Sequence, residues 1–388
     1  MFAIALVYRA AVCVHFLLIG GMAKQWTNEV AAIAHSLVLH HSFGGTYWGY
    51  TGPTAWLAPV YPFLVAGIFR IFGIDSTASA VVLFLLNSIF SSLTALVIYR
   101  FGREHFGEKV ALIAAWAWIV SPLVAMMPLL LWDTSLSALM FTIALFLLLR
   151  ASSPRQWSAA GALWGFCALI SPALLAPLPV ILVYRIWAQR DRPIARLKPA
   201  IAFCLIAACV VLPWTIRNHV VMHANFPVRS NAWAEIYFGN VTFAMHPCAR
   251  PDGLYQQIGE TRFVLQLRDE VIRYIRAHPG PFVLGMLQRT LVFWLMPFSL
   301  LPITILLALG WLTGGVFLAL NRGWDATPFL AIPIFSPIIY SMAHIEARYR
   351  HPIEPVIYLM GAYGAFEIAQ RCRLLARNRE VNAAGGNP

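Results

Sequence analysis

Charged residues are scarce in this chain of 388 residues. They make up 11% of the sequence, whereas 60% is hydrophobic and the mean hydropathy is +0.70. A soluble domain of this size contains about a quarter charged residues, so the scarcity excludes an ordinary soluble protein. The composition is that of a protein that crosses a membrane several times.

Cysteine and the common nucleotide and metal motifs are also lacking. The six cysteines form no CxxC pair and most lie in apolar segments, so we predict neither a disulfide framework nor a structural zinc site. No Walker loop, GxGxxG, GxSxG or HExxH is present, which leaves nucleotide, serine-hydrolase and zinc-protease chemistry without a motif. The cysteines are Cys13, Cys167, Cys204, Cys209, Cys248 and Cys372.

Basic residues outnumber acidic ones by 28 to 16, which gives a net charge of +12. No basic run is combined with a nucleic-acid fold signature, so we predict no nucleic-acid partner. The basic residues instead gather in short loops, which the positive-inside rule places in the cytoplasm. They are Arg100, Arg103, Lys109, Arg150, Arg155, Arg185, Arg190, Arg192, Arg196, Lys198, Arg371, Arg373, Arg377 and Arg379.

Apolar segments predict an all-α polytopic membrane protein with about ten transmembrane helices. An even number of spans places both termini in the cytoplasm. Segments 56–73 and 282–297 break the charge rule if they are counted as spans, so we predict interfacial or re-entrant helices there. The ten predicted spans are 2–22, 78–99, 110–128, 134–149, 158–170, 173–187, 199–215, 300–320, 329–343 and 352–370.

These spans divide a single membrane-embedded domain, 1–388, into a first outer loop (23–77), a long outer loop with interfacial helices (216–298) and a cytoplasmic tail (371–388). The end of the tail, 382–388, is expected to lack regular structure, and Arg9 in the first span is expected to snorkel to the cytoplasmic interface. Acidic residues lie on or near the outer face, where we predict that four loops converge. They are Glu29, Asp75, Asp133, Glu235, Asp252, Glu260, Asp269, Glu270, Glu346 and Glu354.

Glu29 in the first outer loop is the first candidate catalytic residue. Apolar residues recur with helical spacing after it, which predicts a short helix along the bilayer surface with Glu29 in its first turn and Thr27 or Asn28 as its cap. A carboxylate in this position can act as general base toward an incoming hydroxyl. The alternative is an acid that only favours the helix dipole.

Asp133 is the second candidate carboxylate. It follows an apolar run and stands where the third span reaches the outer face. It is either the second carboxylate of the site or the cap of the next helix, which starts near Thr134.

Arg348 and Arg350 flank Tyr349 in the sequence HIEARYRHP, immediately before the last span. Positive residues are disfavoured in an outer turn, so their presence favours an anionic ligand. The planar guanidinium suits a phosphate and would neutralise a departing lipid phosphate. Alternatively, these arginines pair with Glu346, Glu354 or lipid headgroups.

Other polar residues give weaker signals. Arg217 follows PWTI and Asn240 ends YFGN, both at the start of the long outer loop. The histidines of the first outer loop are spaced poorly for one helical face, which favours surface or substrate-contact residues over metal ligands. These histidines are His35, His40 and His41.

Several strings occur in an order that resembles a known family. An acidic residue after the first span is followed by IAHSL and HHSFGG, GPTAWLAPVYPFLVAGIFRIFG, PWTIRNHVVMHANFPVRSNAWAEIYFGN, a basic helix ending in FWLMP, and ARYRHPIEPVIYLMGAYG. In this order they resemble the GT-C membrane glycosyltransferases that use polyprenyl-phosphate sugars. The family 39-like group, which includes protein O-mannosyltransferases and the lipid A aminoarabinose transferase, is the most similar. The likeness covers most of the chain.

The resemblance implies a GT-C-like bundle and an inverting transfer of a hexose or pentose at the periplasmic face of a bacterial inner membrane. The first-loop carboxylate would deprotonate a hydroxyl of a lipid, glycan or protein acceptor, which attacks the anomeric carbon and expels the lipid phosphate. Many relatives have Asp, often Asp-Glu, where this chain has Asn28-Glu29. Either Glu29 has taken over as the base or the enzyme is inactive, and we favour the former because a carboxylate remains. A donor without a nucleotide diphosphate does not require a DxD metal clamp, so no cofactor is certain. A divalent metal ion stays possible.

We therefore predict Glu29 and Asp133 as catalytic residues. A polyprenyl-phosphate-linked sugar, the acceptor and membrane lipids are the expected partners. The predicted substrate-binding residues are Asn28, His41, Tyr61, Arg217, Asn240, Arg348, Tyr349 and Arg350.

Two other classes of function stay open. A transporter or flippase of lipid-linked sugars would need charges along a path, whereas few charges besides Arg9 and Arg70 lie within apolar segments. A structural partner in an envelope complex would leave the outer-face acids and arginines apart in space.

Overall fold

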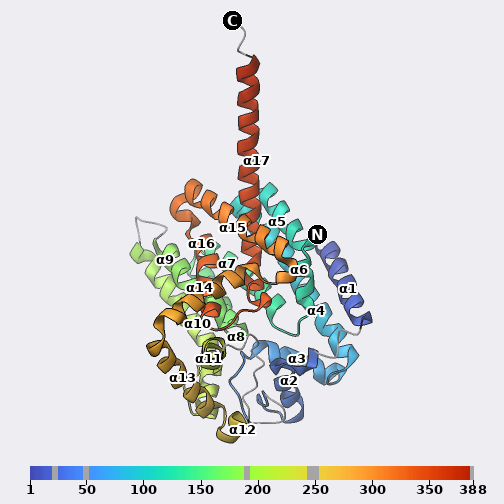
Figure 1. Ribbon diagram of the computed structural model, residues 1–388, viewed down its shortest axis with the longest axis vertical. Helices are drawn as coiled ribbons and strands as arrows, with labels where there is room; N and C mark the ends of the chain where they lie inside the picture. The colour runs from blue at the N-terminus through green and yellow to red at the C-terminus, as the bar shows by residue number, and fades with distance from the viewer. Residues whose placement is uncertain (20–24, 47–51, 188–192, 243–252, 385–388) are drawn as a thin grey trace.

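The computed structural model describes residues 1–19, 25–46, 52–187, 193–242 and 253–384. These residues form helices, and the β-structure among them is an isolated bridge between Gly44 and Pro53. The all-α prediction is therefore confirmed (Figure 1). The helices are α1 (Phe2–Leu18), η1 (Gln25–Thr27), α2 (Glu29–Leu39), α3 (Val60–Phe72), α4 (Thr77–Phe106), α5 (Glu108–Val120), α6 (Pro122–Met126), η2 (Met127–Leu129), α7 (Thr134–Arg150), α8 (Pro154–Ile170), η3 (Pro172–Leu175), α9 (Leu178–Trp187), α10 (Pro193–Met222), α11 (Ala232–Asn240), α12 (Leu254–Ile258), α13 (Glu260–Ala277), α14 (Pro279–Leu295), η4 (Phe298–Leu300), α15 (Leu301–Arg322), η5 (Gly323–Ala326), α16 (Thr327–Ser341), η6 (Ala347–Tyr349), η7 (His351–Ile353) and α17 (Glu354–Ala384).

The apolar helices make this a multi-pass membrane protein. By length and composition, three stretches of the described chain can each cross a membrane: Thr77–Phe106, Leu197–Met222 and Phe298–Ser341. The pair Glu108–Val120 and Pro122–Leu129, bent by 49°, makes a fourth. Shorter apolar helices such as α1 and α7 have 17 residues, the lower end of the length range of about 17–25 residues that spans a bilayer. The count of about ten spans stays a prediction.

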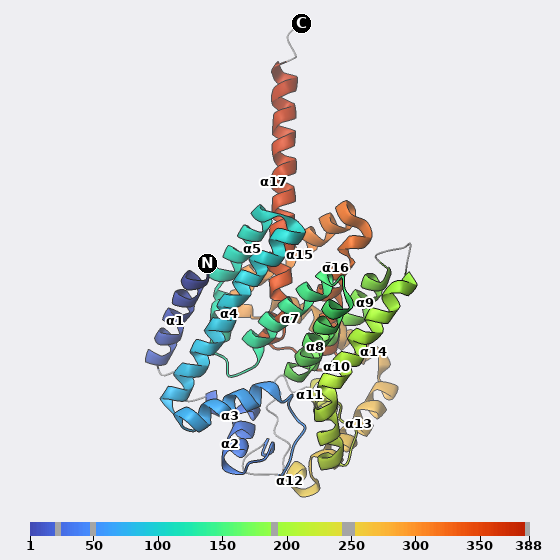
Figure 2. The same ribbon diagram turned by 180° about the vertical axis from the view of Figure 1, so that it is seen from behind.

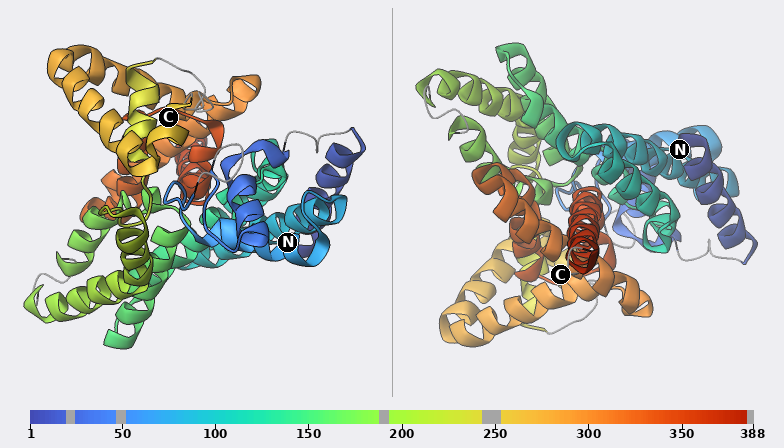
Figure 3. Two further views of the ribbon diagram at one scale, coloured as in Figure 1. Left: turned by 90° about the horizontal axis from the view of Figure 1, so that it is seen from below. Right: turned by 90° about the horizontal axis from the view of Figure 1, so that it is seen from above.

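The last helix, α17, lies near the centre of the bundle and projects beyond the other helices toward the C-terminus (Figures 1 and 2). Seen along its axis, α1 with α4, α8 with α10, and α13 with α14 extend in different directions around it (Figure 3). The predicted tail therefore continues α17 as far as Ala384, and residues 382–384, which were expected to lack regular structure, are helical.

Helices α15 and α17 approach each other through glycines. A Cβ atom added at Gly314 of α15 would lie 1.9 Å from the carbonyl oxygen of Met360 in α17, and one at Gly364 would lie 2.7 Å from the Gly314 nitrogen. Small residues at such places let helix backbones come into contact, which is the usual way in which membrane helices pack closely. The two helices are thus joined along a tight seam.

Two apolar clusters hold the bundle together. The larger one fills the centre of the helices and contains Trp118, Trp157 and Trp164. The second cluster joins the first outer loop to the long outer loop, through residues such as Trp56 and Phe263. The two outer loops therefore form one packed layer at the end of the molecule that carries α2, α3 and α12 (Figure 2).

Arg9 does not snorkel to the surface. It is buried in α1 and donates to the Ser91 hydroxyl over 2.7 Å and to the carbonyl oxygens of Ala5 and Trp118 over 3.3 Å each. A buried charge is tolerated only where hydrogen bonds replace its hydration. Arg9 therefore fastens α1 to α4 and α5.

The short helix α2 packs on protein. Its residues Val30, Ile33 and Ala34 are buried in the second cluster, and α2 lies against α3. By contrast, α14 leaves apolar side chains such as Leu287 and Leu291 exposed, as expected for a helix in contact with lipid. Five cysteines are free in the described chain, while Cys248 and Asp252 lie outside the described residues.

Candidate active site

A cavity of about 1040 Å³ lies where four outer segments meet. This volume is at the upper end of the range of about 300–1,000 Å³ that is typical of small-molecule sites. Most of the lining comes from the first outer loop (26–57), the start of α7 with the two residues before it (132–137), the long outer loop (227–236) and the end of α16 with the turn before α17 (339–352). Residues from the end of α8 and η3 (168–175) and Val211 of α10 complete it. The predicted convergence of four outer segments is thus seen in the structure.

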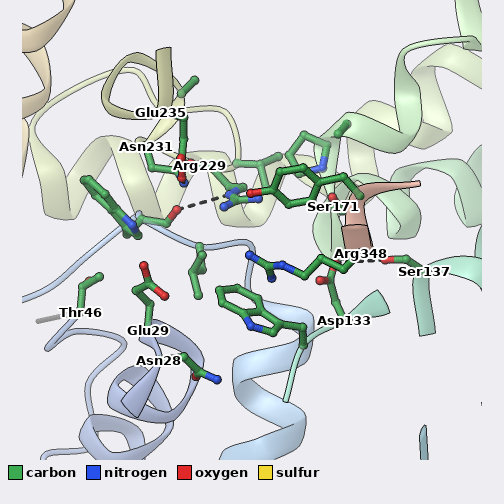
Figure 4. A pocket seen from close by; sticks show the side chains of 18 of the residues that line it. Asn28, Glu29, Thr46, Asp133, Ser137, Ser171, Arg229, Asn231, Glu235 and Arg348 are labelled. Carbon is green, nitrogen blue, oxygen red and sulfur yellow. Dashed lines mark hydrogen bonds between the residues drawn. The ribbon is translucent and has the colours of Figure 1, made fainter. Parts of the chain in front are cut away.

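Glu29 is the first residue of α2 and directs its carboxylate into the cavity (Figure 4). The preceding Asn28 caps the helix, because its Oδ1 accepts from the Ala31 N–H over 2.9 Å, while its Nδ2 donates to the Leu131 carbonyl over 3.4 Å. Burial raises the pKa of Glu29 above its usual value, although its own backbone N–H and Arg348 oppose the shift. A raised pKa makes Glu29 a better proton acceptor than an exposed carboxylate.

Asp133 lies in the cavity wall immediately before α7. Its carboxylate accepts from the Ser137 hydroxyl over 3.0 Å and does not cap the helix N-terminus (Figure 4). Burial raises the pKa of Asp133, while the nearby charges of Arg229 and Arg348 act in the opposite direction. Of the two interpretations open from the sequence, the geometry favours a carboxylate of the site over a helix cap.

Arg348 fits both interpretations that the sequence left open, an ion pair with a carboxylate and a contact to an anionic ligand. It pairs with Glu346, and its guanidinium carbon lies 3.6 Å from the centroid of the Trp132 ring. Although burial disfavours the charge, Glu346 raises the pKa of Arg348, so this arginine stays cationic. Its guanidinium still faces the cavity, on the side of Arg229 (Figure 4).

His344 links two carboxylates of the cavity wall. Its Nδ1 lies 3.2 Å from Glu235 of α11, and its Nε2 lies 3.6 Å from Glu346 and 2.8 Å from the Tyr349 hydroxyl. Burial disfavours a charged imidazole, but the two carboxylates outweigh it and raise the pKa of His344 to about 9. Burial also acts against the Glu346 charge, yet Arg348 and His344 lower the pKa of that carboxyl to about 2.

Close packing brings α11 to this network. A Cβ atom added at Gly239 would lie 1.7 Å from the carbonyl oxygen of Ala343, so only glycine fits there. Asn231 at the start of α11 donates to Glu235 over 2.6 Å and fixes its other carboxylate oxygen. Glu235 and His344 were not among the predicted site residues.

Arg229 is a further cavity residue that the sequence predictions missed. It lies in the long outer loop, and its Nε donates to the Trp56 carbonyl over 3.3 Å (Figure 4). The argument that singled out Arg348, a basic residue in a predicted outer segment, applies equally to Arg229. Five of the predicted site residues do line the cavity together. They are Asn28, Glu29, Asp133, Arg348 and Tyr349.

The structure places the other predicted substrate-binding residues outside the cavity lining. Arg350 is buried, pairs with Glu354 over 3.0 Å and donates to two main-chain carbonyls at the end of α14. Tyr61 is buried in α3 and donates to Asn87 over 3.2 Å. Both side chains hold helices together through these contacts inside the bundle.

Arg217, Asn240 and His41 also lie elsewhere. Arg217 donates to two carbonyls of the first outer loop, Thr54 over 2.5 Å and Phe43 over 2.9 Å. Asn240 donates to two main-chain carbonyls and accepts from Arg289 over 2.7 Å. His41 is exposed in a left-handed turn with φ of 50°. Arg217 and Asn240 share one reason for their positions, because both side chains satisfy main-chain carbonyls.

Comparisons with known proteins bear on the fold. Residues 51–216 match the family described as dolichyl-phosphate-mannose-protein mannosyltransferase. The whole chain is similar to an Archaeoglobus fulgidus oligosaccharyltransferase solved with Zn and sulfate: TM-score 0.56, 16% identity, 98% of this chain and 51% of that one. AglB from the same organism, solved with an inhibitory peptide and a dolichol-phosphate, gives a TM-score of 0.55 at 15% identity, over 100% of this chain and 52% of that one.

The chain therefore has the fold of these oligosaccharyltransferases. This confirms the predicted resemblance, although the chain spans only about half the length of these oligosaccharyltransferases. ArnT from Cupriavidus metallidurans, solved with undecaprenyl phosphate, matches 92% of this chain and 77% of that one at 15% identity, but its TM-score of 0.39 is too low to bear on the fold. No curated protein sequence matches the chain significantly.

In the described cavity lining, carboxylates, arginines and the imidazole of His344 are the charged groups. Glu29 and Asp133 can accept a proton, and Arg229 and Arg348 can neutralise an anion. Among the described residues, no three His, Cys, Asp or Glu side chains are grouped as ligands for a metal ion. The arrangement suits the transfer of a group from an anionic leaving group to a hydroxyl.

Proposed function

We propose that the protein is an inverting glycosyltransferase that transfers a sugar from a polyprenyl-phosphate donor to an acceptor hydroxyl. One observation carries the proposal: two carboxylates, Glu29 and Asp133, and two guanidinium groups, Arg229 and Arg348, line one cavity of a GT-C fold. A general base and a site for a phosphate are the two things that this reaction needs.

Glu29 is the proposed general base. It accepts the proton of the acceptor hydroxyl as that oxygen attacks the anomeric carbon of the donor sugar. The bond from that carbon to the phosphate oxygen breaks on the opposite side, which inverts the configuration, and polyprenyl phosphate leaves with the electron pair. The raised pKa of Glu29 supports this role, since a base whose pKa is closer to the working pH transfers protons more effectively.

Arg348 and Arg229 are the proposed partners of the leaving phosphate. The guanidinium of Arg348 is held by Glu346 and by the Trp132 ring, so its direction is set before a ligand arrives. Asp133 lies near both arginines and offsets part of their positive charge. Asp133 is the second candidate base if Glu29 proves dispensable.

A lipid-phosphate donor also agrees with the comparisons. The matching family is described by its use of dolichyl-phosphate-mannose, and the structure of AglB contains a dolichol-phosphate. We extend this chemistry to the present chain and propose a hexosyl or pentosyl donor. The acceptor is a lipid, glycan or protein hydroxyl.

We further propose that the site faces the periplasm of a bacterial inner membrane. The basic residues of the short loops support this orientation through the positive-inside rule. The start of α1 and the end of α17 lie toward the end of the bundle opposite α2 and α12, which agrees with two cytoplasmic termini (Figure 1).

Transfer of labelled sugar from a panel of polyprenyl-phosphate sugars tests the proposal. Purified protein in detergent, with a membrane extract as acceptor, is compared with Glu29→Gln and with Asp75→Asn. Asp75 is a matched carboxylate of the same loop that does not itself line the cavity, and an asparagine in its place can still accept a hydrogen bond from its partner His35. We expect product from wild type and Asp75→Asn and none from Glu29→Gln. No product from any donor would overturn the proposal, and full activity of Glu29→Gln would move the role of base to Asp133.

The alternative, a transporter or flippase of lipid-linked sugars, predicts a different outcome. Substrate would then cross the membranes of reconstituted vesicles, and crossing would persist in Glu29→Gln. Arg9, one of the few charges within a span, is bound to Ser91 and to main-chain carbonyls, which favours a structural role over a place on a transport path.

A further inference from the structure

Glu260 is an acidic residue of the long outer loop that does not line the cavity. It is the first residue of α13, and only 6% of its surface is exposed. Burying a carboxylate is costly unless hydrogen-bond donors replace the lost water.

Four donors satisfy this carboxylate. Oε1 accepts from the Ala55 N–H over 2.8 Å and from the Ser230 hydroxyl over 2.6 Å. Oε2 accepts from the Thr54 hydroxyl and, over 2.7 Å, from the Tyr255 hydroxyl. Three separate segments, 54–55, 230 and 255, therefore meet at one side chain.

Each of the first two segments leads directly to a cavity residue. Trp56 follows Ala55, and its N–H donates to the Thr54 hydroxyl oxygen over 2.9 Å. Arg229 precedes Ser230, whose N–H donates to the Ala55 carbonyl over 2.8 Å. The Trp56 carbonyl in turn accepts from Arg229 Nε. A closed set of hydrogen bonds thus connects the buried carboxylate to the arginine in the cavity.

We propose that Glu260 is a positioning residue that holds Arg229 and Trp56 in the geometry used for phosphate binding; this rests on the proposed function. It touches neither donor nor acceptor and acts through the two segments that it joins. A carboxylate suits this place because it accepts from four donors at once, whereas a glutamine would present two of its own N–H groups to Thr54 and Tyr255.

A double-mutant cycle with amide exchange tests this role. The variants are Glu260→Gln, Arg229→Ala and their combination, with Asp269→Asn as a matched control, since Asp269 is an exposed carboxylate of the same helix. Ser230→Ala and Tyr255→Phe each remove one donor and serve if Glu260→Gln fails to fold. The readouts are KM and kcat for the polyprenyl-phosphate sugar and hydrogen exchange at the amides of Ala55, Trp56 and Ser230.

We expect Glu260→Gln to raise KM for the donor about tenfold with a smaller change in kcat, because a displaced Arg229 binds phosphate less well. The double variant should be no worse than Arg229→Ala alone, since both changes remove the same interaction. Exchange should become faster at these amides in Glu260→Gln and remain unchanged in Asp269→Asn.

Additive effects on KM, unchanged exchange at these amides, or faster exchange throughout the chain would each overturn the positioning role. If wild type transfers sugar from no donor, the proposed function fails. Hydrogen exchange then tests the inference alone. Faster exchange in Glu260→Gln that is confined to the segments of Trp56 and Arg229 supports the positioning role, and any other pattern overturns it.

Discussion

The guanidinium carbon of Arg348 lies 3.6 Å from the centroid of the Trp132 ring. This contact joins the turn before α17 to the residue that precedes Asp133. It therefore holds the Arg348 cation and the Asp133 carboxylate in the same part of the cavity. Stacking on an indole face restricts the guanidinium to one plane and leaves its edge free for hydrogen bonds. The position of Arg348 is therefore set by packing as well as by its ion pair with Glu346.

Replacing Arg348 by lysine tests whether the planar group matters. Arg348→Lys keeps the charge but loses both the stacking and the two-pronged donor edge. We expect kcat/KM for the donor to fall about tenfold to a hundredfold, mainly through KM, in a steady-state transfer assay. Arg322→Lys, outside the cavity lining, is the control and should change little. Activity of Arg348→Lys equal to wild type would argue against a bidentate phosphate contact.

The pH dependence of transfer should report Glu29. A base must be deprotonated, and burial raises the pKa of Glu29 above its ordinary value of 4.5. We therefore expect kcat/KM to rise with pH along an acidic limb whose midpoint lies above 4.5. The limb should stay in place in Asp133→Asn. A limb that moves with Asp133→Asn would assign the proton acceptor to Asp133.

The His344 network should make stability depend on pH. The pKa of His344 is raised from 6.5 to about 9 in the folded state, so its contribution is complete below pH 6.5 and is lost as pH rises through about 9. Such a shift corresponds to a stabilisation on the order of 3 kcal/mol. Thermal unfolding in detergent between pH 6 and 10 should show a falling Tm at the alkaline end.

His344→Gln should remove most of that alkaline fall. His223→Asn is a suitable control, because His223 is exposed and has a left-handed conformation that asparagine accepts. An alkaline fall of Tm that is equally steep in His344→Gln would show that other groups cause it. Below pH 4.5 the same network should weaken again, as Glu346, whose pKa is lowered to about 2, takes up its proton.

Gly239 and Gly67 offer a pair of alanine substitutions with opposite expected signs. Alanine at position 239 would place its Cβ 1.7 Å from the Ala343 carbonyl oxygen, which forces α11 and Glu235 away from His344. We expect a loss of about 1–3 kcal/mol in stability, together with reduced transfer. Gly67 lies in α3 with nothing within 4 Å of an added Cβ, so alanine should stabilise that helix by about 0.5–1 kcal/mol. Thermal unfolding of both variants measures the contrast.

Much of the fold follows from sequence because local signals were strong. Hydropathy located the apolar helices, and the Asn28-Glu29 pair marked the start of α2, where the Asn28 cap and the buried face of Val30 and Ile33 agree with the pattern. Convergence of the outer segments was also predictable, since the acids and the basic turn before the last span lay at one predicted face. The cavity confirms that convergence for Glu29, Asp133 and Arg348.

The roles of individual polar residues were harder to predict, because they depend on partners far away in the sequence. Arg350 and Arg217 looked like ligand-binding groups, but each satisfies carbonyls of a segment that lies more than 50 residues away. Glu260 looked like one acid among several on an amphipathic helix, whereas its four donors come from three other segments. Such partners become visible only when the chain is folded.

The glycine seam between α15 and α17 implies that the two proposed phosphate contacts, Arg348 and Arg229, differ in how rigidly they are held. The turn that carries Arg348 runs directly into α17, so Arg348 belongs to the framework that the seam makes rigid. Arg229 belongs to an outer loop that depends on hydrogen bonds to the first outer loop. Under the proposed function, a lipid-linked donor and the lipid phosphate released from it both pass through the site. We therefore expect the cavity to open on the side of Arg229, while Arg348 stays in place as a contact for the reacting phosphate.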